Sequence, residues 1–152
     1  MMENNKRPLF LLEEKLTYKL RGVFIEISKK HGCLFKEKAY YKLICEEFKN
    51  RNIAFLFQPK ITLHNFESSK MIDEYYPDFV VEDKIIIEVK AQGQIFNNHI
   101  DQLIKYLSST KFELGFIVNF GTPMVQIERR IFTNNRKPFI CDSSQISTDE
   151  HR

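Results

Sequence analysis

The sequence YPDFVVEDKIIIEVKA, residues 76–91, decides the fold class. Two short apolar runs flank the polar pair Glu82-Asp83, which is the pattern of a β-hairpin with buried strands. Three ionisable residues, Asp78, Glu88 and Lys90, lie within these runs. Burying a charge costs free energy unless the charge is paired or binds a metal, so these three residues form the first candidate site.

The register of this hairpin decides whether the three side chains can meet. Glu88 and Lys90 are two residues apart on one strand, so their side chains leave the same face about 7 Å apart. A two-residue turn would place Asp78 opposite Ile87 and on the other face. A three-residue loop at 82–84, or a bulge at the proline before Asp78, would bring Asp78 to the face of Glu88. We therefore predict an irregular hairpin, with the Asp78 and Glu88 carboxylates within about 6 Å.

Such an arrangement would suit a divalent cation. Two carboxylates that converge on one point are hard oxygen ligands of the kind that Mg²⁺ prefers, and a neighbouring ammonium can position or deprotonate a water for attack on phosphorus. The alternative is that Glu88 and Lys90 end an edge strand as a solvated pair, while Asp78 follows a proline in a turn. The apolar run at 85–87 argues against an edge strand.

Hydrophobic spacing along the rest of the chain predicts the other elements. Three- and four-residue steps indicate helices, and apolar or alternating runs indicate strands. The expected helices span residues 9–30, 35–50 and 97–109, and the expected strands span 53–63, 75–81, 84–90, 114–120 and 124–132. Their order predicts an α/β fold with a central mixed β-sheet flanked by helices, in which the last helix joins two parallel strands.

Length and composition bound the domain organisation. The chain has 152 residues, of which 43% are hydrophobic and 28% charged, the profile of one compact domain. We expect this domain to cover residues 1–133, and residues 134–152 to form a polar, weakly ordered tail in which Phe139-Ile140 could dock. The sequence contains no run of about 18 apolar residues, which excludes a membrane-spanning helix.

Charge and cysteine content limit the partners and the compartment. Cys33, Cys45 and Cys141 are odd in number and lack zinc-site spacing, which favours a reduced cytoplasmic or nuclear compartment over secretion. The net charge of +3 is compatible with a nucleic-acid partner but is too small to argue for one.

The hairpin motif and the order of elements together carry a family resemblance. Pro77-Asp78, followed after nine residues by Glu88-Val89-Lys90, resembles the PD-(D/E)XK nuclease superfamily. Residues 16–130 are similar, more narrowly, to the GxxExxY family of that superfamily. The matching segments are Glu26 with Lys30-His31-Gly32, and residues 37–40, 78–84, 88–91, 102–107 and 115–121. The glycine in the family's name falls at Leu34 here, so the turn before the second helix must follow another backbone path.

This resemblance implies a fold and an activity. The fold would be a restriction-endonuclease-like core in the order αβββαβ with an extra N-terminal helix. The activity would be hydrolysis of phosphodiester bonds in nucleic acid, DNA more than RNA, with Mg²⁺ or, in its place, Mn²⁺. Asp78 and Glu88 would be metal ligands together with the backbone carbonyl of Val89, and Lys90 would act on the nucleophilic water. A homodimer is possible, since enzymes that cut both strands commonly dimerise.

Supporting residues follow from the resemblance and from helix spacing. Glu37 would join the catalytic set and the metal ligands; the alternative is a solvated glutamate favoured by the helix dipole. Gln102, with Tyr106 one turn later, would support the metal or the phosphate, or else be a plain surface residue. Lys105, Tyr106 and Arg129 would contact nucleic acid, the alternative being scattered solvated charge.

Two other functional classes remain open. One is a nucleic-acid-binding or protein-scaffold domain that keeps the nuclease-like fold without turnover, against which the intact set of Asp78, Glu88 and Lys90 counts. The other is a small structural domain that works through a partner protein, favoured if the exposed aromatic residues near Phe66, Tyr75 and Tyr76 form a patch. Titration with a divalent metal separates both classes from a nuclease.

Overall fold

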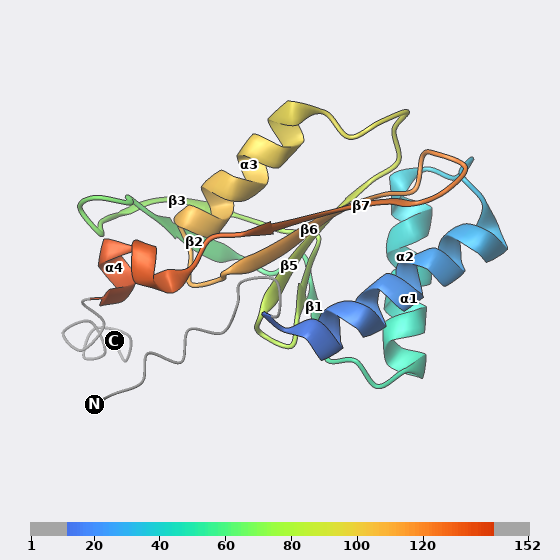
Figure 1. The fold of residues 1–152 in the computed structure, drawn as a ribbon, viewed down its shortest axis with the longest axis horizontal. Helices are drawn as coiled ribbons and strands as arrows, with labels where there is room; N and C mark the ends of the chain where they lie inside the picture. The colour runs from blue at the N-terminus through green and yellow to red at the C-terminus, as the bar shows by residue number, and fades with distance from the viewer. Residues whose placement is uncertain (1–11, 142–152) are drawn as a thin grey trace.

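The computed structural model describes residues 12–141 and shows a central sheet between two helical layers (Figure 1). Helices α1 (Glu14–His31) and α2 (Glu37–Asn50) cover one face, and α3 (Asn97–Ser108) covers the other. The five strands of the sheet are, in spatial order, β1 (Phe55–Phe57), β4 (Phe79–Val81), β5 (Ile85–Lys90), β6 (Leu114–Asn119) and β7 (Gln126–Ile131). A separate two-stranded sheet consists of β2 (Ile61–His64) and β3 (Met71–Tyr75). Among the described residues, no helix is both long and apolar enough to cross a membrane.

The sheet combines antiparallel and parallel pairing. Strand β4 pairs antiparallel with both β1 and β5. Strands β5 and β6, which α3 connects in the chain, pair parallel, and β7 pairs antiparallel with β6. The order α2, β1, β4, β5, α3, β6 is the predicted αβββαβ core, and α1 is the extra N-terminal helix. The predicted α/β class, with a mixed sheet flanked by helices, is confirmed.

Strand β5 is buried on both faces because it lies in the middle of the sheet. Ile85, Ile87 and Val89 pack in the cluster that contains α1 and α2, whereas Ile86 packs in the cluster that contains α3. Side chains alternate along a strand, so Glu88 and Lys90 leave the sheet on the α3 side. The central position of β5 also rules out the edge-strand alternative for these two residues.

Several element boundaries differ from the prediction. The single strand predicted over residues 53–63 is wrong, because Gln58, with φ of 50°, and Pro59 separate β1 from β2. The sequence pattern does not predict β3, whose residues 71–74 are all exposed and do not alternate. Tyr75, expected to begin the first hairpin strand, ends β3 instead. Helix α1 begins at Glu14, and residues 9–11, where we expected its start, lie outside the described residues.

The connection between α1 and α2 depends on Gly32. This residue has φ of 74°, in the left-handed region that favours glycine, and it ends α1. The Tyr40 hydroxyl donates to the Gly32 carbonyl over 2.7 Å, and its ring stacks on Phe120 at a centroid distance of 4.5 Å. Leu34, where the resemblance to the GxxExxY family leads us to expect a glycine, is 94% exposed. The turn therefore uses Gly32, and Tyr40 serves the packing of the fold.

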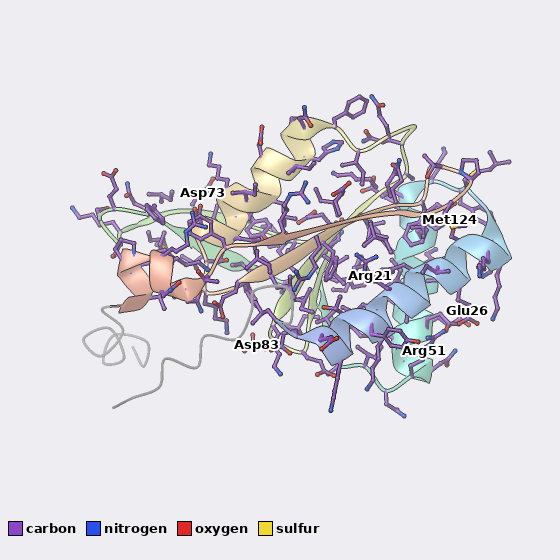
Figure 2. All side chains as sticks on the ribbon, viewed as in Figure 1. Arg21, Glu26, Arg51, Asp73, Asp83 and Met124 are labelled. Carbon is purple, nitrogen blue, oxygen red and sulfur yellow. The ribbon has the colours of Figure 1, made fainter. Side chains whose placement is uncertain are left out.

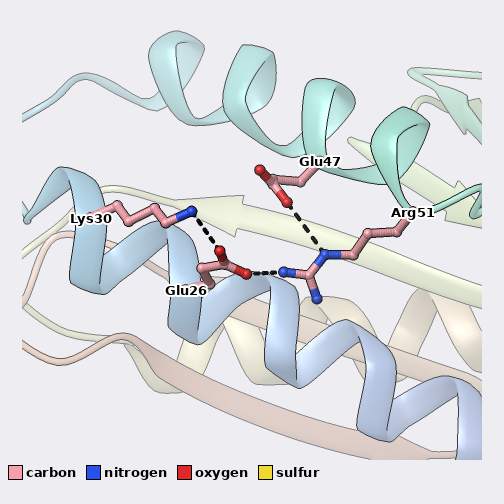
Figure 3. A network of polar contacts seen from close by, with 4 residues as sticks. All are labelled: Glu26, Lys30, Glu47 and Arg51. Carbon is pink, nitrogen blue, oxygen red and sulfur yellow. Dashed lines mark hydrogen bonds and ion pairs between the residues drawn. The ribbon is translucent and has the colours of Figure 1, made fainter.

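Glu26 belongs to an ion-pair network that joins α1 to α2 (Figure 3). Its carboxylate contacts the Lys30 ammonium at 2.5 Å and also pairs with the Arg51 guanidinium, which contacts Glu47 at 3.3 Å. Figure 2 places Glu26 and Arg51 side by side where the two helices meet. These contacts account for Glu26 without a catalytic role, and such exposed pairs stabilise a fold only slightly.

The segment after β7 packs onto the domain through a buried lysine. A 3-10 turn (Asn134–Arg136) and the short helix α4 (Pro138–Cys141) follow β7. The Lys137 ammonium donates to the carbonyls of Thr110 and Phe112 and to Oδ1 of Asn134 over 2.7–2.8 Å. Phe139 is buried, as the predicted docking requires. The first part of the predicted tail is thus packed, whereas residues 142–152 lie outside the described residues.

Candidate active site

The loop between β4 and β5 sets the register on which the site depends. Phe79 pairs with Ile87 and Val81 with Ile85, so the loop has three residues, 82–84. This is the loop length that brings the Asp78 side chain to the face of Glu88. Its first two residues have positive φ, and the Lys84 amide donates to the Val81 carbonyl over 3.0 Å. Continuing the register by one pair places Asp78 opposite Glu88, on the same face of the sheet. The predicted irregular hairpin is confirmed.

Asp78 comes immediately before β4, and two hydrogen bonds hold its carboxylate. Its Oδ2 accepts from the Val89 amide at 2.7 Å, and its Oδ1 accepts from the Tyr41 hydroxyl at 2.9 Å. Only 8% of the residue is exposed. Burial raises the pKa of the Asp78 carboxyl, while the hydrogen bond from Val89 acts in the opposite direction. The carboxylate is therefore fixed against the C-terminal end of β5.

The same register explains why the Val89 carbonyl is available to a ligand. The amide and carbonyl of one strand residue point to the same side, so the Val89 carbonyl points toward β4, as its amide does. The position opposite Val89 falls to Pro77. Proline has no N–H, so it cannot donate to this carbonyl. Pro77 thus leaves the Val89 carbonyl without a ladder donor at this position, next to the amide that Asp78 binds.

Glu88 contributes a buried oxygen that lacks a partner. Its Oε1 is inaccessible and forms no hydrogen bond within the described residues. Burial, followed by repulsion from Asp78, raises the pKa of the Glu88 carboxyl to about 8. Leaving a buried acceptor unsatisfied costs free energy, which a cation at this oxygen would recover.

The donor set fits a hard divalent cation. Two carboxylates and a backbone carbonyl offer the oxygen ligands that Mg²⁺ and Mn²⁺ take, with water completing the shell. Within the described residues, no group of three or more His, Cys, Asp or Glu side chains is arranged to hold a metal. The ligands from the protein would be Asp78, Glu88 and the Val89 carbonyl, whereas Glu37, which we also expected to bind the metal, contacts the Tyr41 hydroxyl.

Tyr41 links Glu37 to this set. Its hydroxyl lies 2.6 Å from Oε1 of Glu37 and 2.9 Å from Oδ1 of Asp78. A hydroxyl carries one hydrogen, so without a cation one of these two carboxyls must be protonated for both contacts to be hydrogen bonds. Glu37 is thus brought to Asp78 through Tyr41. Sequence reasoning missed Tyr41, although its spacing of four residues from Glu37 was a signal.

Lys90 lies at the end of β5, beside both carboxylates. Its charge lowers the pKa of Asp78 and of Glu88, in opposition to the burial of each. The Lys90 carbonyl accepts from the Phe120 amide at 2.8 Å, which keeps the residue in the sheet. The Lys90 ammonium is therefore the cationic group of the site.

Asn119 anchors the loop that follows Lys90. This fully buried amide accepts from the Gln92 amide at 3.0 Å through Oδ1 and donates to the Gln92 carbonyl at 2.9 Å through Nδ2. The Gly121 amide also donates to Oδ1 at 3.1 Å. Hydrogen bonds from Asn119 therefore hold the loop after β5 against the end of β6.

The close approach at Gly121 yields a stability prediction. A Cβ at this residue would lie 2.1 Å from the Gln92 carbonyl oxygen. The neighbouring Gln92 atoms are all backbone, so Gly121→Ala can be accommodated only if the loop moves. We expect the free energy of unfolding, measured in urea, to fall by about 1–3 kcal/mol. Gly93→Ala is the matched control, since nothing lies within 4 Å of that Cβ. Equal stabilities of the two variants would contradict this account of the loop.

Helix α3 presents a polar face near Glu88 and Lys90. Gln102 donates through Nε2 to the Tyr106 hydroxyl over 2.7 Å, and the Tyr106 ring stacks on Tyr75 at 3.8 Å. The charge of Glu88 contributes to the raised pKa of Tyr106. Gln102 therefore reaches the site through Tyr106. Burial and then the charge of Lys90 lower the pKa of His99 on the same helix.

The three residues expected to contact nucleic acid do not share one surface. Lys105 is exposed on α3, next to Tyr106. Arg129 pairs with Phe116, whose side chain belongs to the cluster on the α1 face, and its guanidinium donates to the Leu12 carbonyl over 3.1 Å. Figure 2 labels Arg21 on the same α1 side, and its charge lowers the pKa of Arg129. Arg129 is thus on the opposite face of the sheet from Lys105.

A family comparison agrees with this geometry. The family described as the PD-(D/E)XK nuclease superfamily matches residues 14–131, which include Asp78, Glu88 and Lys90. The chain belongs to this superfamily. A search of curated protein sequences found no match.

Two solved structures are similar to this PD-(D/E)XK protein. The crystal structure of SSO0001 has a TM-score of 0.50 at 16% identity, covering 91% of this chain and 71% of that one. An alkaline exonuclease (LHK-Exo) from Laribacter hongkongensis has a TM-score of 0.42 at 13% identity, covering 75% and 59%. The first likeness concerns the fold alone. Together with the family match, it confirms the predicted restriction-endonuclease-like class.

The raised pKa values of the nuclease-like site predict how stability depends on pH. The Glu88 pKa is about 8 in the folded protein, against an ordinary value of 4.5. Between these values the folded protein keeps a proton that the unfolded chain has released, so stability is lost as the pH rises. With EDTA present, we expect the melting temperature to fall between about pH 5 and pH 8.

Glu88→Gln is the control for this pH dependence. Its melting temperature should fall less over the same range, because the carboxyl that titrates is gone. The lowered pKa of His99 acts in the opposite direction in both proteins, so the difference between them isolates Glu88. Identical pH profiles for wild type and variant would show that Glu88 is not the titrating group.

Proposed function

We propose that this protein is a divalent-metal-dependent nuclease of the GxxExxY family that hydrolyses phosphodiester bonds, in DNA more than in RNA. Mg²⁺ would be the usual ion, and Mn²⁺ would support the same reaction in its place. One observation carries the proposal. The buried, unpartnered oxygen of Glu88 lies in the site that Asp78 and the Val89 carbonyl share, beside the Lys90 ammonium.

Each residue of the site has a distinct proposed task. Asp78, Glu88 and the Val89 carbonyl would hold the cation. A bound divalent cation lowers the pKa of water and offsets charge on phosphoryl oxygens. Lys90 would orient the attacking water and stabilise negative charge on the phosphate. Glu37 would act through Tyr41, which keeps the Asp78 carboxylate directed at the site.

Substrate contacts would come from the α3 side of the sheet. Lys105 and Tyr106 lie there, and Gln102 is hydrogen-bonded to Tyr106. Contacts of this kind to phosphate and sugar set position and carry no sequence information, so we propose modest sequence specificity. Cleavage of both strands of a duplex would need two such sites, which a homodimer would supply.

A cleavage assay tests this function. Labelled single- and double-stranded DNA and RNA are incubated with the protein in Mg²⁺, in Mn²⁺ and in EDTA, alongside Asp78→Ala. We expect cleavage only with metal, DNA cut faster than RNA, and a loss of at least about a hundredfold in the variant. Equal cleavage by Asp78→Ala would indicate contamination and contradict the proposal. Nucleic-acid binding without any cleavage would favour the catalytically silent alternative.

A further inference from the structure

A second buried polar atom without a partner lies on the same side of the sheet as the Glu88 side chain. Within the described residues, the Tyr75 hydroxyl is inaccessible and forms no hydrogen bond, like Oε1 of Glu88. Buried polar groups are normally hydrogen-bonded, so an orphaned donor and an orphaned acceptor on one side of the sheet require an explanation. The cation that the proposed function requires would occupy only part of the Glu88 carboxylate. One oxygen would then remain for a donor from the protein.

The position of Tyr75 is fixed by packing. Tyr75 ends β3, pairs with Ile61, and is 8% exposed. Its ring stacks almost parallel on Tyr106, with 15° between the planes and 3.8 Å between centroids. It belongs to the same apolar cluster as Ile86, two residues before Glu88 on the same face of β5. The ring is therefore held on the side of the sheet where the Glu88 side chain leaves.

The charge of Glu88 also acts on the Tyr75 hydroxyl. Burial raises the pKa of Tyr75, and the charge of Glu88 is the next cause, ahead of Tyr106 and Asp78. A phenol donates one hydrogen bond and gains most when its acceptor is a carboxylate. Glu88 is the carboxylate whose effect on Tyr75 is largest.

We propose that Tyr75 is a positioning residue whose hydroxyl donates to the Glu88 carboxylate, at the oxygen that the cation leaves free. The inference rests on the proposed function, because it concerns the orientation of one of its metal ligands. Ligating carboxylates are themselves usually hydrogen-bonded, and such outer contacts fix the ligand for the metal. The stack on Tyr106 would also connect this bond to Gln102 on α3.

Tyr75→Phe tests the inference with two measurements. By calorimetry with Mn²⁺ alone, we expect affinity to fall by about tenfold or more, the usual effect of losing such a contact. In EDTA, we expect the melting temperature to stay equal or rise, because the variant removes a buried hydroxyl that has no partner. Tyr76→Phe is the matched control, since the neighbouring side chain is 59% exposed, and it should match wild type in both measurements.

The outcomes separate this inference from the proposed function. Wild-type Mn²⁺ affinity in Tyr75→Phe, while wild type binds Mn²⁺ and Asp78→Ala does not, would overturn the role of Tyr75 alone. A marked loss of stability in EDTA would also overturn it, because the hydroxyl would then stabilise the fold through another partner. A wild-type protein that binds no Mn²⁺ would overturn the metal site and this inference together.

Discussion

Glu88→Gln should remove measurable binding of Mg²⁺ and Mn²⁺ and yet raise the melting temperature of the protein in EDTA. The amide is nearly isosteric with the carboxyl but loses the anionic ligand. It also removes the repulsion that Asp78 exerts on a buried carboxylate, which is one cause of the raised Glu88 pKa. We expect Mn²⁺ affinity to fall by at least about a hundredfold and the melting temperature at pH 8 to rise by about 2–4 °C.

Calorimetry and thermal unfolding in EDTA measure these two effects on the same samples. Glu47→Gln is a suitable control, since Glu47 belongs to the surface network of Figure 3 and should leave Mn²⁺ affinity unchanged. Unchanged affinity in Glu88→Gln would contradict the ligand role. A lower melting temperature would show instead that the Glu88 carboxylate stabilises the fold.

Lys90→Met should lower turnover while leaving the affinity for metal nearly intact. The Lys90 ammonium would orient the attacking water and stabilise the charge that develops on the phosphate. The oxygen ligands of the metal come from neighbouring residues. We expect turnover to fall by about a hundredfold to ten-thousandfold. Methionine preserves most of the length of the side chain, so the packing of β5 should persist.

Single-turnover cleavage at saturating Mn²⁺ isolates this effect from binding. Lys84→Met provides a control for the loss of a lysine, because Lys84 lies in the exposed loop of the hairpin and pairs with Glu13. A loss of metal affinity in Lys90→Met as large as that in Glu88→Gln would show that Lys90 has been assigned the wrong task.

The sequence predicts the core of this fold because its strongest signals are local. The apolar run at 85–87 and the polar loop at 82–84 set β5 and the hairpin register, and these determine which faces Asp78 and Glu88 share. Counting residues was sufficient to see that only an irregular hairpin allows the site. The structure confirms that register.

Residues that act through tertiary contacts could not be found in this way. Tyr41 reaches Asp78 across 37 positions in the chain, and Tyr75 meets Tyr106 only because β3 folds against α3. Strand β3 itself has no alternating pattern, since its residues 71–74 are all exposed. The face on which Arg129 lies likewise depends on its register with Phe116, which no local pattern reveals.

Anomalous diffraction from a crystal soaked in Mn²⁺ tests the central claim most directly. The account predicts one anomalous peak between the start of β4 and the C-terminal end of β5, within ligand distance of Asp78, Glu88 and the Val89 carbonyl oxygen, and no such peak in crystals of Glu88→Gln. No peak at this position in the wild type, or a peak bound elsewhere on the protein, would contradict the account.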